Sequence, residues 1–142
     1  MQVRPIEASA TYSLRSQVLR PGLPLAASLY PQDPEAVHFG VFEGEEVVSV
    51  VTAHPENSPL FAREGQWRIR GMATHPQRQG RGLGRAGLEA LLAWGRGRGV
   101  PLFWCNARVG ALRFYARAGF SVESELFDIP GIGPHKVMKI DL

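Results

Sequence analysis

The centre of the chain reads Gln79-Gly80-Arg81-Gly82-Leu83-Gly84-Arg85-Ala86, where three glycines alternate with larger residues. An apolar spacing typical of one helical face follows, so we predict a helix from Gly82 to Arg96. Alternating glycines let a ligand approach the backbone closely, and free N–H groups at the start of a helix favour an anion. The arginines of this stretch and Arg78 add positive charge. The turn is therefore predicted to bind a phosphate or pyrophosphate group.

Two other phosphate-binding motifs share features with this turn. A Walker A loop places Lys and then Ser or Thr after its last glycine, whereas Arg85-Ala86 follows here. The dinucleotide fingerprint Gly-x-Gly-x-x-Gly matches residues 82–87, but it also requires an acidic residue about twenty positions later. Residues 90–122 contain no Asp or Glu, which disfavours a nicotinamide cofactor. The remaining alternative is a glycine-rich loop without a ligand.

The segments on either side of the glycine turn predict a single domain over residues 1–142. Strands are expected over residues 2–6, 37–42, 46–53, 66–74, 101–105, 119–127 and 135–140. Helices are expected over residues 10–19, with Ser9 as the N-cap, 82–96 and 108–118. The β-α-β unit around the turn requires a parallel strand pair, and the hairpins require antiparallel pairs. The fold class is therefore α/β or mixed α+β, with helices covering a central mixed sheet.

The composition is that of a globular protein, with 44% hydrophobic and 20% charged residues. No apolar run approaches the roughly 20 residues of a membrane span, and the N-terminus shows no signal region. The single cysteine, Cys105, excludes an internal disulfide and suits a reducing cytoplasm. Within the net charge of +3 lies a basic segment, residues 63–98, with eight arginines and two glutamates. It indicates a nucleic acid, a membrane surface or a phosphorylated small molecule as partner, or a solvated basic surface.

Three further segments accompany the glycine turn in a fixed order. The segment Arg70-Gly71-Met72-Ala73-Thr74-His75-Pro76 precedes it, and Trp104-Cys105-Asn106-Ala107-Arg108 and Phe114-Tyr115-Ala116-Arg117-Ala118-Gly119-Phe120 follow it. Together they resemble the GCN5-related N-acetyltransferase (GNAT) family along almost the whole chain. Gln79, Gly82 and Gly84 fill that family's acyl-CoA signature, Gln/Arg-x-x-Gly-x-Gly/Ala. The resemblance implies a GNAT-like fold in which the strands before and after the central helix splay apart.

The resemblance also implies a reaction and a cofactor site. An acetyl group would pass from acetyl-CoA directly to the primary amine of an unidentified small-molecule or peptide acceptor, through a tetrahedral intermediate and without a metal. Pantetheine would lie between the splayed strands, and a bulge at Gly71 would turn an N–H toward the thioester carbonyl. Asn106 would bond the pantetheine arm, although an Asn there also suits a helix or turn cap. The implied cofactor-binding residues are Met72, Ala73, Thr74, Gln79, Gly80, Arg81, Gly82, Leu83, Gly84, Arg85, Asn106, Phe114 and Tyr115.

The predicted catalytic residues are Tyr115, His135 and His38. Tyr115 is the expected general acid, because a phenol can protonate the departing thiolate. An attacking amine must lose a proton, and the candidate bases are His38, His135 and Glu125. Cys105 lies in an apolar segment and is interpreted as a small core residue, not a nucleophile. His54 is expected at a strand end on the surface.

The acceptor cannot be derived from the sequence, but its surroundings can be predicted in part. Arg15 and Arg20 on the first helix could hold an acceptor carboxylate or be ordinary solvated charges. The alternative function is a non-catalytic module that binds CoA or associates with RNA. No aromatic and basic residues alternate along a strand, which disfavours RNA. We therefore expect a cytoplasmic enzyme with no nucleic-acid or membrane partner, and the family resemblance is compatible with a homodimer.

Overall fold

A mixed sheet crossed by helices organises the structure, a computed structural model that describes residues 1–142. The strands are β1 (Gln2–Pro5), β2 (Val37–Glu43), β3 (Glu46–Pro55), β4 (Trp67–Thr74), β5 (Leu102–Arg108), β6 (Ser121–Val122), β7 (Phe127–Ile129) and β8 (Gly133–Asp141). The helices are α1 (Tyr12–Leu14), α2 (Leu83–Gly97) and α3 (Leu112–Arg117). The order in the sheet is β1-β2-β3-β4-β5-β8-β6, and β7 also pairs with β8.

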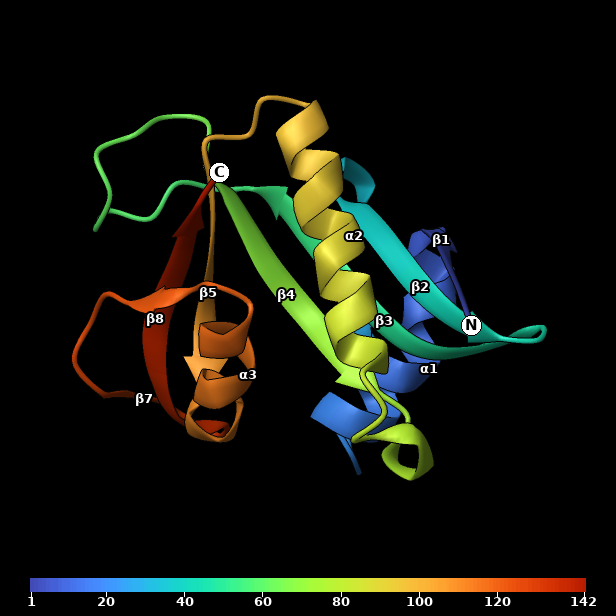
Figure 1. Cartoon of the computed structure of the whole chain (residues 1–142). Coiled ribbons are helices and arrows are strands. Elements are labelled where there is room, and N and C mark those ends of the chain that lie inside the picture. Colours follow the sequence, from blue (N-terminus) through green and yellow to red (C-terminus); the bar gives the residue numbers. More distant parts are fainter.

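The contact between β4 and β5 is the only parallel one in the sheet. It consists of two residue pairs, Trp67 with Phe103 and Arg68 with Trp104. Beyond these pairs the two strands separate, which Figure 1 shows as a gap that widens toward their C-terminal ends. All other strand pairs are antiparallel. The predicted fold class, with a splayed parallel pair in a mostly antiparallel sheet, is confirmed.

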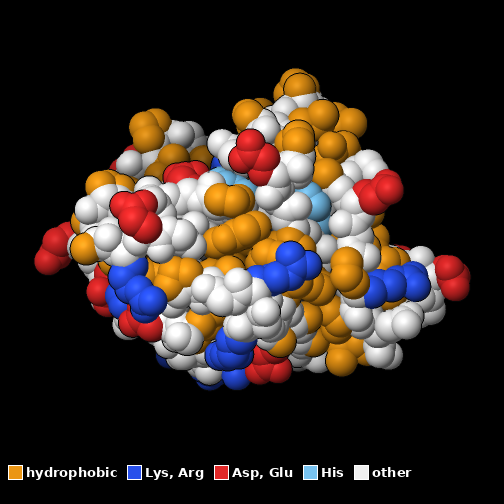
Figure 2. Space-filling model, turned by 90° about the horizontal axis from the view of Figure 1, so that it is seen from above, with side chains coloured by type: hydrophobic (Ala, Val, Ile, Leu, Met, Phe, Trp, Pro, Cys, Tyr) orange, Lys and Arg blue, Asp and Glu red, His pale blue; other side chains and the backbone are white.

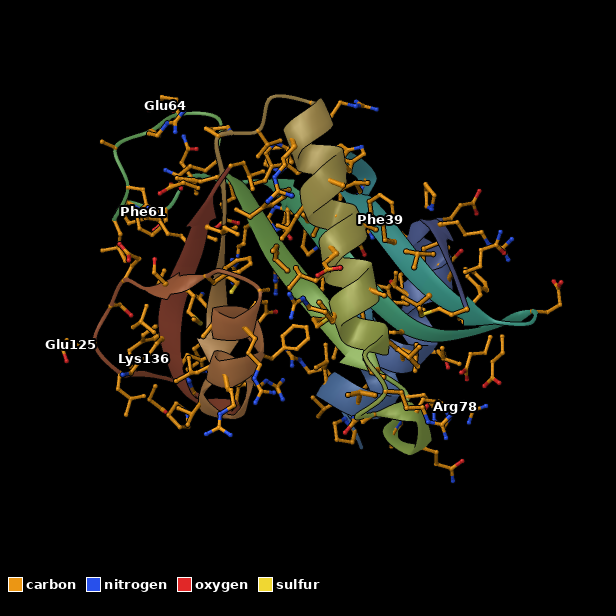
Figure 3. All side chains as sticks on the ribbon, viewed as in Figure 1. Phe39, Phe61, Glu64, Arg78, Glu125 and Lys136 are labelled. Carbon is orange, nitrogen blue, oxygen red and sulfur yellow. The ribbon has the colours of Figure 1, made fainter.

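The helices cover both faces of the sheet. Helix α2 and helix α3 lie on one face, and α1 lies on the other, behind the sheet in Figure 1. The apolar face of α2 packs on the sheet, with Leu88 and Leu91 completely inaccessible. Beneath it lie Phe39 of β2, labelled in Figure 3, and Val51 of β3, in the same core cluster. No helix of the structure is both long and apolar enough to cross a membrane.

The first helical segment differs from the regular helix predicted over residues 10–19. It begins at Ala8 with a 3₁₀ turn, continues through α1 and ends in a π turn over Arg15–Leu19. The N-cap is Glu7, not Ser9, and it forms no side-chain capping bond. The widened turn starts at Arg15, whose side chain is completely buried. The change from α-helical to π-helical spacing therefore occurs at a residue with many tertiary contacts, and helix propensity alone does not predict such a change.

The strand predicted over residues 119–127 is also wrong, because it is two short strands, β6 and β7, separated by residues 123–126. The hydroxyl of Ser124 accepts the Val137 N–H at 2.8 Å, in the place of a backbone carbonyl. The Ser124 side chain thus takes the hydrogen bond of a β8 N–H group, and the backbone at Ser124 does not pair with β8 there. Strand β5 in turn continues to Arg108, three residues beyond the predicted end.

The packing of α2 against β5 gives a testable prediction at Gly95. A Cβ atom there would lie 2.4 Å from Phe103 Cε2 and 3.1 Å from Leu142 Cδ1. We expect Gly95→Ala to lower the unfolding free energy by about 1–3 kcal/mol, because overpacking outweighs the gain in helix propensity. Gly97→Ala is the matched control, since nothing lies within 4 Å of its Cβ position. Urea unfolding should show equal or higher stability for the control; a stabilised Gly95→Ala would contradict this packing.

Candidate functional site

The divergence of β4 and β5 leaves two strand edges without a strand partner. After Arg68, β4 pairs only with β3, and after Trp104, β5 pairs only with β8. A cavity of about 240 Å³ lies between them, lined by residues 68–72 and 105–108 and by side chains from other segments. Backbone groups on such edges can hydrogen-bond an extended ligand as if it were an added strand.

Gly71 forms the expected bulge on the cavity side of the sheet. Thr52 pairs with Arg70 and Val50 with Ala73, so two residues of β4 stand opposite one of β3. Gly71 has φ +64°, a conformation that side chains disfavour. A Cβ atom there would also lie 3.0 Å from Arg15 Nε. Both the backbone conformation and this close contact therefore disfavour a larger residue. The bulge changes the direction of the main chain where it lines the cavity.

The glycine turn lies on the surface, at the wide end of the gap (Figure 1). Gly80 and Gly82 have φ of +80° and +78°, and Gly82 is the N-cap of α2. The first helical bond runs from the Ala86 N–H to the Gly82 carbonyl at 3.0 Å. The N–H groups of residues 83–85 therefore have no acceptor within the helix. This is the geometry that binds an anion at a helix start.

The three arginines that are predicted to add positive charge at the turn all have acidic partners. Arg78 binds Glu43 at 2.7 Å and Glu46 at 3.3 Å, and Figure 3 shows it at this turn. Arg81 lies 3.9 Å from Glu43, and Arg85 forms a 2.8 Å pair with the Glu89 carboxylate. The Arg81 and Arg85 side chains are 56% and 43% exposed, so these pairs are weak and can exchange for a phosphate.

The end of β4, the glycine turn and α3 meet at Gly84. Its Cβ position lies 3.2 Å from Thr74 Oγ1 and 3.6 Å from Phe114 Cε1, so a larger residue would fill this junction. The side chain of Gln79 donates to the Thr74 carbonyl at 3.2 Å and ties the turn to the strand. Met72, Asn106, Phe114 and Tyr115 line the cavity itself. The glycine turn is thus joined to the strand that lines the cavity, whereas the side chains of Ala73 and Leu83, also predicted to bind the cofactor, are buried in core clusters.

Asn106 does not cap a helix or a turn. It lies within β5, opposite Val137 of β8, and lines the cavity. The prediction that the strand ends near Cys105 was wrong, because pairing with β8 extends it. An amide at this position can face a ligand between the strands.

Tyr115 is almost completely buried, with 5% of its surface exposed, and it lines the cavity. Its ring packs edge to face against Phe114 and Phe120. Burial raises the pKa of the Tyr115 phenol well above its usual value. Burial likewise raises the pKa of the neighbouring Cys105 thiol to about 12. Both groups are therefore neutral near pH 7, and the phenol retains a proton that it can donate.

His135 is the candidate base that the structure places at the cavity. It is 3% exposed, and its Nδ1 lies 2.7 Å from the Gly133 carbonyl oxygen. A carbonyl only accepts hydrogen bonds, so Nδ1 carries the proton and Nε2 has the lone pair in the neutral ring. Glu125, the rival on the preceding loop, is exposed and points away from the molecule in Figure 3.

His38 lies outside the cavity lining, in a separate buried network. Its Nδ1 is 2.7 Å from Thr52 Oγ1, which also accepts a 2.7 Å bond from Arg15 Nη2. Burial lowers the pKa of the His38 imidazole. His54 is 1% exposed, so its expected surface position was wrong. It ends a strand in sequence, but that strand runs between β2 and β4 in the sheet.

Arg15 is neither a solvated charge nor a cavity residue. It is completely buried, and its Nη1 forms an ion pair of 2.8 Å with Asp33. Burial tends to raise the pKa of Asp33, but the hydrogen bond and charge of Arg15 outweigh it and hold that pKa below its usual value. Asp33 belongs to a short 3₁₀ turn, Asp33–Glu35. Neither earlier interpretation of Arg15 therefore holds.

Four arginines line the cavity, and no aspartate or glutamate does. Arg68 has a carboxylate partner, Glu56, at 3.3 Å. The other three bond only uncharged oxygens: Arg20 and Arg108 donate to the Leu19 carbonyl at 3.0 and 3.3 Å, and Arg70 donates to Gln32 at 3.4 Å. Desolvation, then the charge of a neighbouring arginine, lowers the pKa of both Arg70 and Arg108. Of Arg15 and Arg20, the two arginines predicted to hold an acceptor carboxylate, only Arg20 lines the cavity.

A second hollow continues the cavity toward the exterior. It has a volume of about 490 Å³ and shares Leu19, Arg20, Arg108 and Ile132 with the inner cavity. Its other walls come from Pro21, Leu23, Pro130 and Gly131. On the face in Figure 2, Lys and Arg side chains are spread among hydrophobic ones and form no continuous patch.

Comparisons with known proteins point to one family. A family model described as the acetyltransferase (GNAT) family matches residues 8–120. YitI of Bacillus subtilis (strain 168), an uncharacterized N-acetyltransferase, is 34% identical over 144 residues, which cover 97% of this chain and 94% of YitI. A structure from Lactobacillus plantarum, assigned provisionally as an N-acetyltransferase, has a TM-score of 0.82 at 21% identity and covers 100% of this chain and 99% of its own. A GNAT acetyltransferase from Elizabethkingia anophelis with acetyl-CoA bound has 0.73 at 14% identity, with 99% and 97% covered.

Proposed function

The chain belongs to the GNAT family of acetyltransferases, and from this premise we propose that it acetylates the amine of an acceptor that also carries an anionic group. Acetyl-CoA is the donor. The observation that supports the acceptor class is the group of cavity arginines without carboxylate partners, Arg20, Arg70 and Arg108.

The donor site follows the path from the glycine turn into the cavity. The free N–H groups of residues 83–85 receive the pyrophosphate, with Arg81 and Arg85 exchanging their weak surface pairs for phosphate oxygens. The pantetheine arm extends between β4 and β5 and hydrogen-bonds their unpaired edges. The bulge at Gly71 presents main-chain N–H to the thioester oxygen, where negative charge develops.

The transfer is direct, from thioester to amine. His135 Nε2 takes a proton from the amine, and the amine nitrogen forms a bond to the acetyl carbonyl carbon. The tetrahedral intermediate then collapses as the C–S bond breaks, and the Tyr115 hydroxyl supplies a proton to the departing thiolate. Cys105 stays a thiol because burial raises its pKa, so no acyl-enzyme forms on it.

The cavity arginines bind the anionic group of the acceptor, at the end away from its amine. Arg20, Arg70 and Arg108 are half-buried. Removing several guanidinium groups from water together without a carboxylate is unfavourable, and an anionic ligand would offset that cost. Within the basic segment of residues 63–98, Arg68 and Arg70 line the cavity, and Arg78, Arg81 and Arg85 lie at the glycine turn. Five of the eight arginines in this segment therefore lie at the two proposed small-molecule sites, which supports these sites over a nucleic acid as the reason for the charge.

The test is a thiol-release assay with acetyl-CoA and matched acceptor pairs. Glycine and glycinamide form one pair, β-alanine and β-alaninamide a second, and O-phosphoethanolamine and ethanolamine a third; only the first member of each pair carries an anionic group beside its amine. We expect the anionic member to have a kcat/KM about 10–100-fold higher, the range of one or two charge-assisted hydrogen bonds. No turnover of any amine would overturn the proposed activity, and equal turnover of all three pairs would overturn the acceptor class.

A further inference from the structure

The ring of Tyr30 packs against two guanidinium groups from different parts of the chain. Arg15 Cζ lies 4.0 Å from the ring centroid, and Arg70 Cζ lies 4.3 Å from it. Tyr30 is 8% exposed and lines the cavity. Cations over an aromatic face are attracted by its quadrupole, most strongly where water is excluded. The ring therefore links a buried arginine to a cavity arginine.

The Arg15 end of this stack is fixed. Its guanidinium binds both Asp33 oxygens, at 2.8 and 3.0 Å, and donates to Thr52 Oγ1 at 2.7 Å and to the Ser28 carbonyl at 3.1 Å. Asp33 also accepts the backbone N–H of Tyr30 at 3.2 Å. One carboxylate thus holds both the arginine under the ring and the backbone that carries the ring. Such a network leaves little freedom to either.

The Arg70 end is held by much less. Apart from the ring, its only polar contact within the chain is the 3.4 Å bond to Gln32 Oε1. Its side chain is half-buried and lines the cavity. Arginine has several rotatable bonds, and ordering it at the moment of binding would weaken affinity. The Tyr30 ring is therefore the contact that orders Arg70 in advance.

We propose that Tyr30 is a positioning residue that sets acceptor specificity, holding Arg70 ready for the anionic end of the acceptor with Arg15 and Asp33 as a rigid support. The inference rests on the proposed function, since it concerns the same acceptor site. The Arg15–Asp33 ion pair would then do more than stabilise the fold, because it holds the Tyr30 ring in place and the ring holds Arg70.

The test compares Tyr30→Leu and Tyr30→Met, which fill space without an aromatic face, with Tyr30→Phe, which keeps the ring. The probes are the fastest anionic acceptor among glycine, β-alanine and O-phosphoethanolamine and its counterpart without the anionic group, which is glycinamide, β-alaninamide or ethanolamine. We expect both aliphatic variants to raise KM for the anionic acceptor about tenfold, with kcat, KM for acetyl-CoA and KM for the uncharged acceptor nearly unchanged. Tyr30→Phe should behave as wild type.

Inorganic phosphate provides a second readout, as a competitive inhibitor against the same acceptor. Its inhibition constant should rise about tenfold in Tyr30→Leu and Tyr30→Met and stay constant in Tyr30→Phe. Equal loss for charged and uncharged acceptors, or full selectivity in both aliphatic variants, would overturn the inference and leave the proposed function intact. A wild-type enzyme that does not distinguish the acceptor pairs would overturn both. Calorimetric binding of CoA confirms that each variant is folded.

Discussion

Tyr115→Phe is expected to lower kcat about 100-fold or more while KM for acetyl-CoA changes by no more than roughly twofold. The substitution removes only the hydroxyl, so the edge-to-face packing on Phe114 and Phe120 survives. Without that hydroxyl the thiolate must leave unprotonated or take its proton from water, and the C–S bond breaks more slowly. Steady-state thiol release with acetyl-CoA and the best acceptor measures both constants.

Tyr12→Phe is the matched control for the loss of a phenolic hydroxyl, because Tyr12 lies outside the cavity lining. Its kcat should equal that of the wild type. Because burial raises the pKa of Tyr115 well above its usual value, the acid stays protonated through the neutral range. The wild-type rate should therefore not decline through loss of this proton near pH 8 or 9. An unchanged kcat in Tyr115→Phe would exclude the phenol as the acid.

The outline of the fold could be derived from the sequence because its signals are local. The apolar stripe of α2, the turn at Gly44 between β2 and β3, and the glycines before α2 each lie within one short segment. The β-α-β unit then requires a parallel pair, which is the β4–β5 contact. The bulge at Gly71 was expected from the family resemblance, and a glycine within a strand is compatible with it.

The environment of Arg15 could not be derived in this way. Its partner Asp33 lies eighteen residues away, in a segment with no periodic pattern, and nothing local marks the two as a pair. His54 was misplaced for a related reason: strand order, not strand sequence, puts β3 inside the sheet. Ser124 interrupts a strand through one side-chain bond to Val137, which propensity does not register.

The grouping of arginines around the cavity could not be predicted from the sequence either. Arg70 belongs to β4, Arg108 ends β5, and Arg20 follows the π turn, so their convergence depends on how the splayed strands and the first helical segment meet. The sequence predicts part of this grouping, because Arg68, Arg70 and Met72 alternate along β4 and alternate residues of a strand share one face. The bulge at Gly71, however, changes which face of the sheet the residues after Arg70 occupy. The proposed acceptor class thus rests on tertiary structure, whereas the proposed donor site rests on a sequence motif.

His135→Asn is expected to lower kcat/KM for the acceptor about 100-fold at pH 7, the typical contribution of a positioned general base. The bond from Nδ1 to the Gly133 carbonyl leaves Nε2 as the proton acceptor at the cavity, and an amide nitrogen or oxygen cannot replace it as a base. KM for acetyl-CoA should stay close to the wild-type value. Glu125→Gln is the control, and because Glu125 is exposed its kcat/KM should not change.

The pH dependence separates this role from a purely structural one. Below its own pKa the amine arrives protonated, and the enzyme must remove that proton before attack. As the pH rises toward the amine pKa, solvent supplies the free amine and the base matters less. The deficit of His135→Asn should therefore shrink steadily from pH 7 to pH 9.5, measured with one acceptor. A deficit that is constant over this range would indicate that His135 shapes the cavity without accepting the proton.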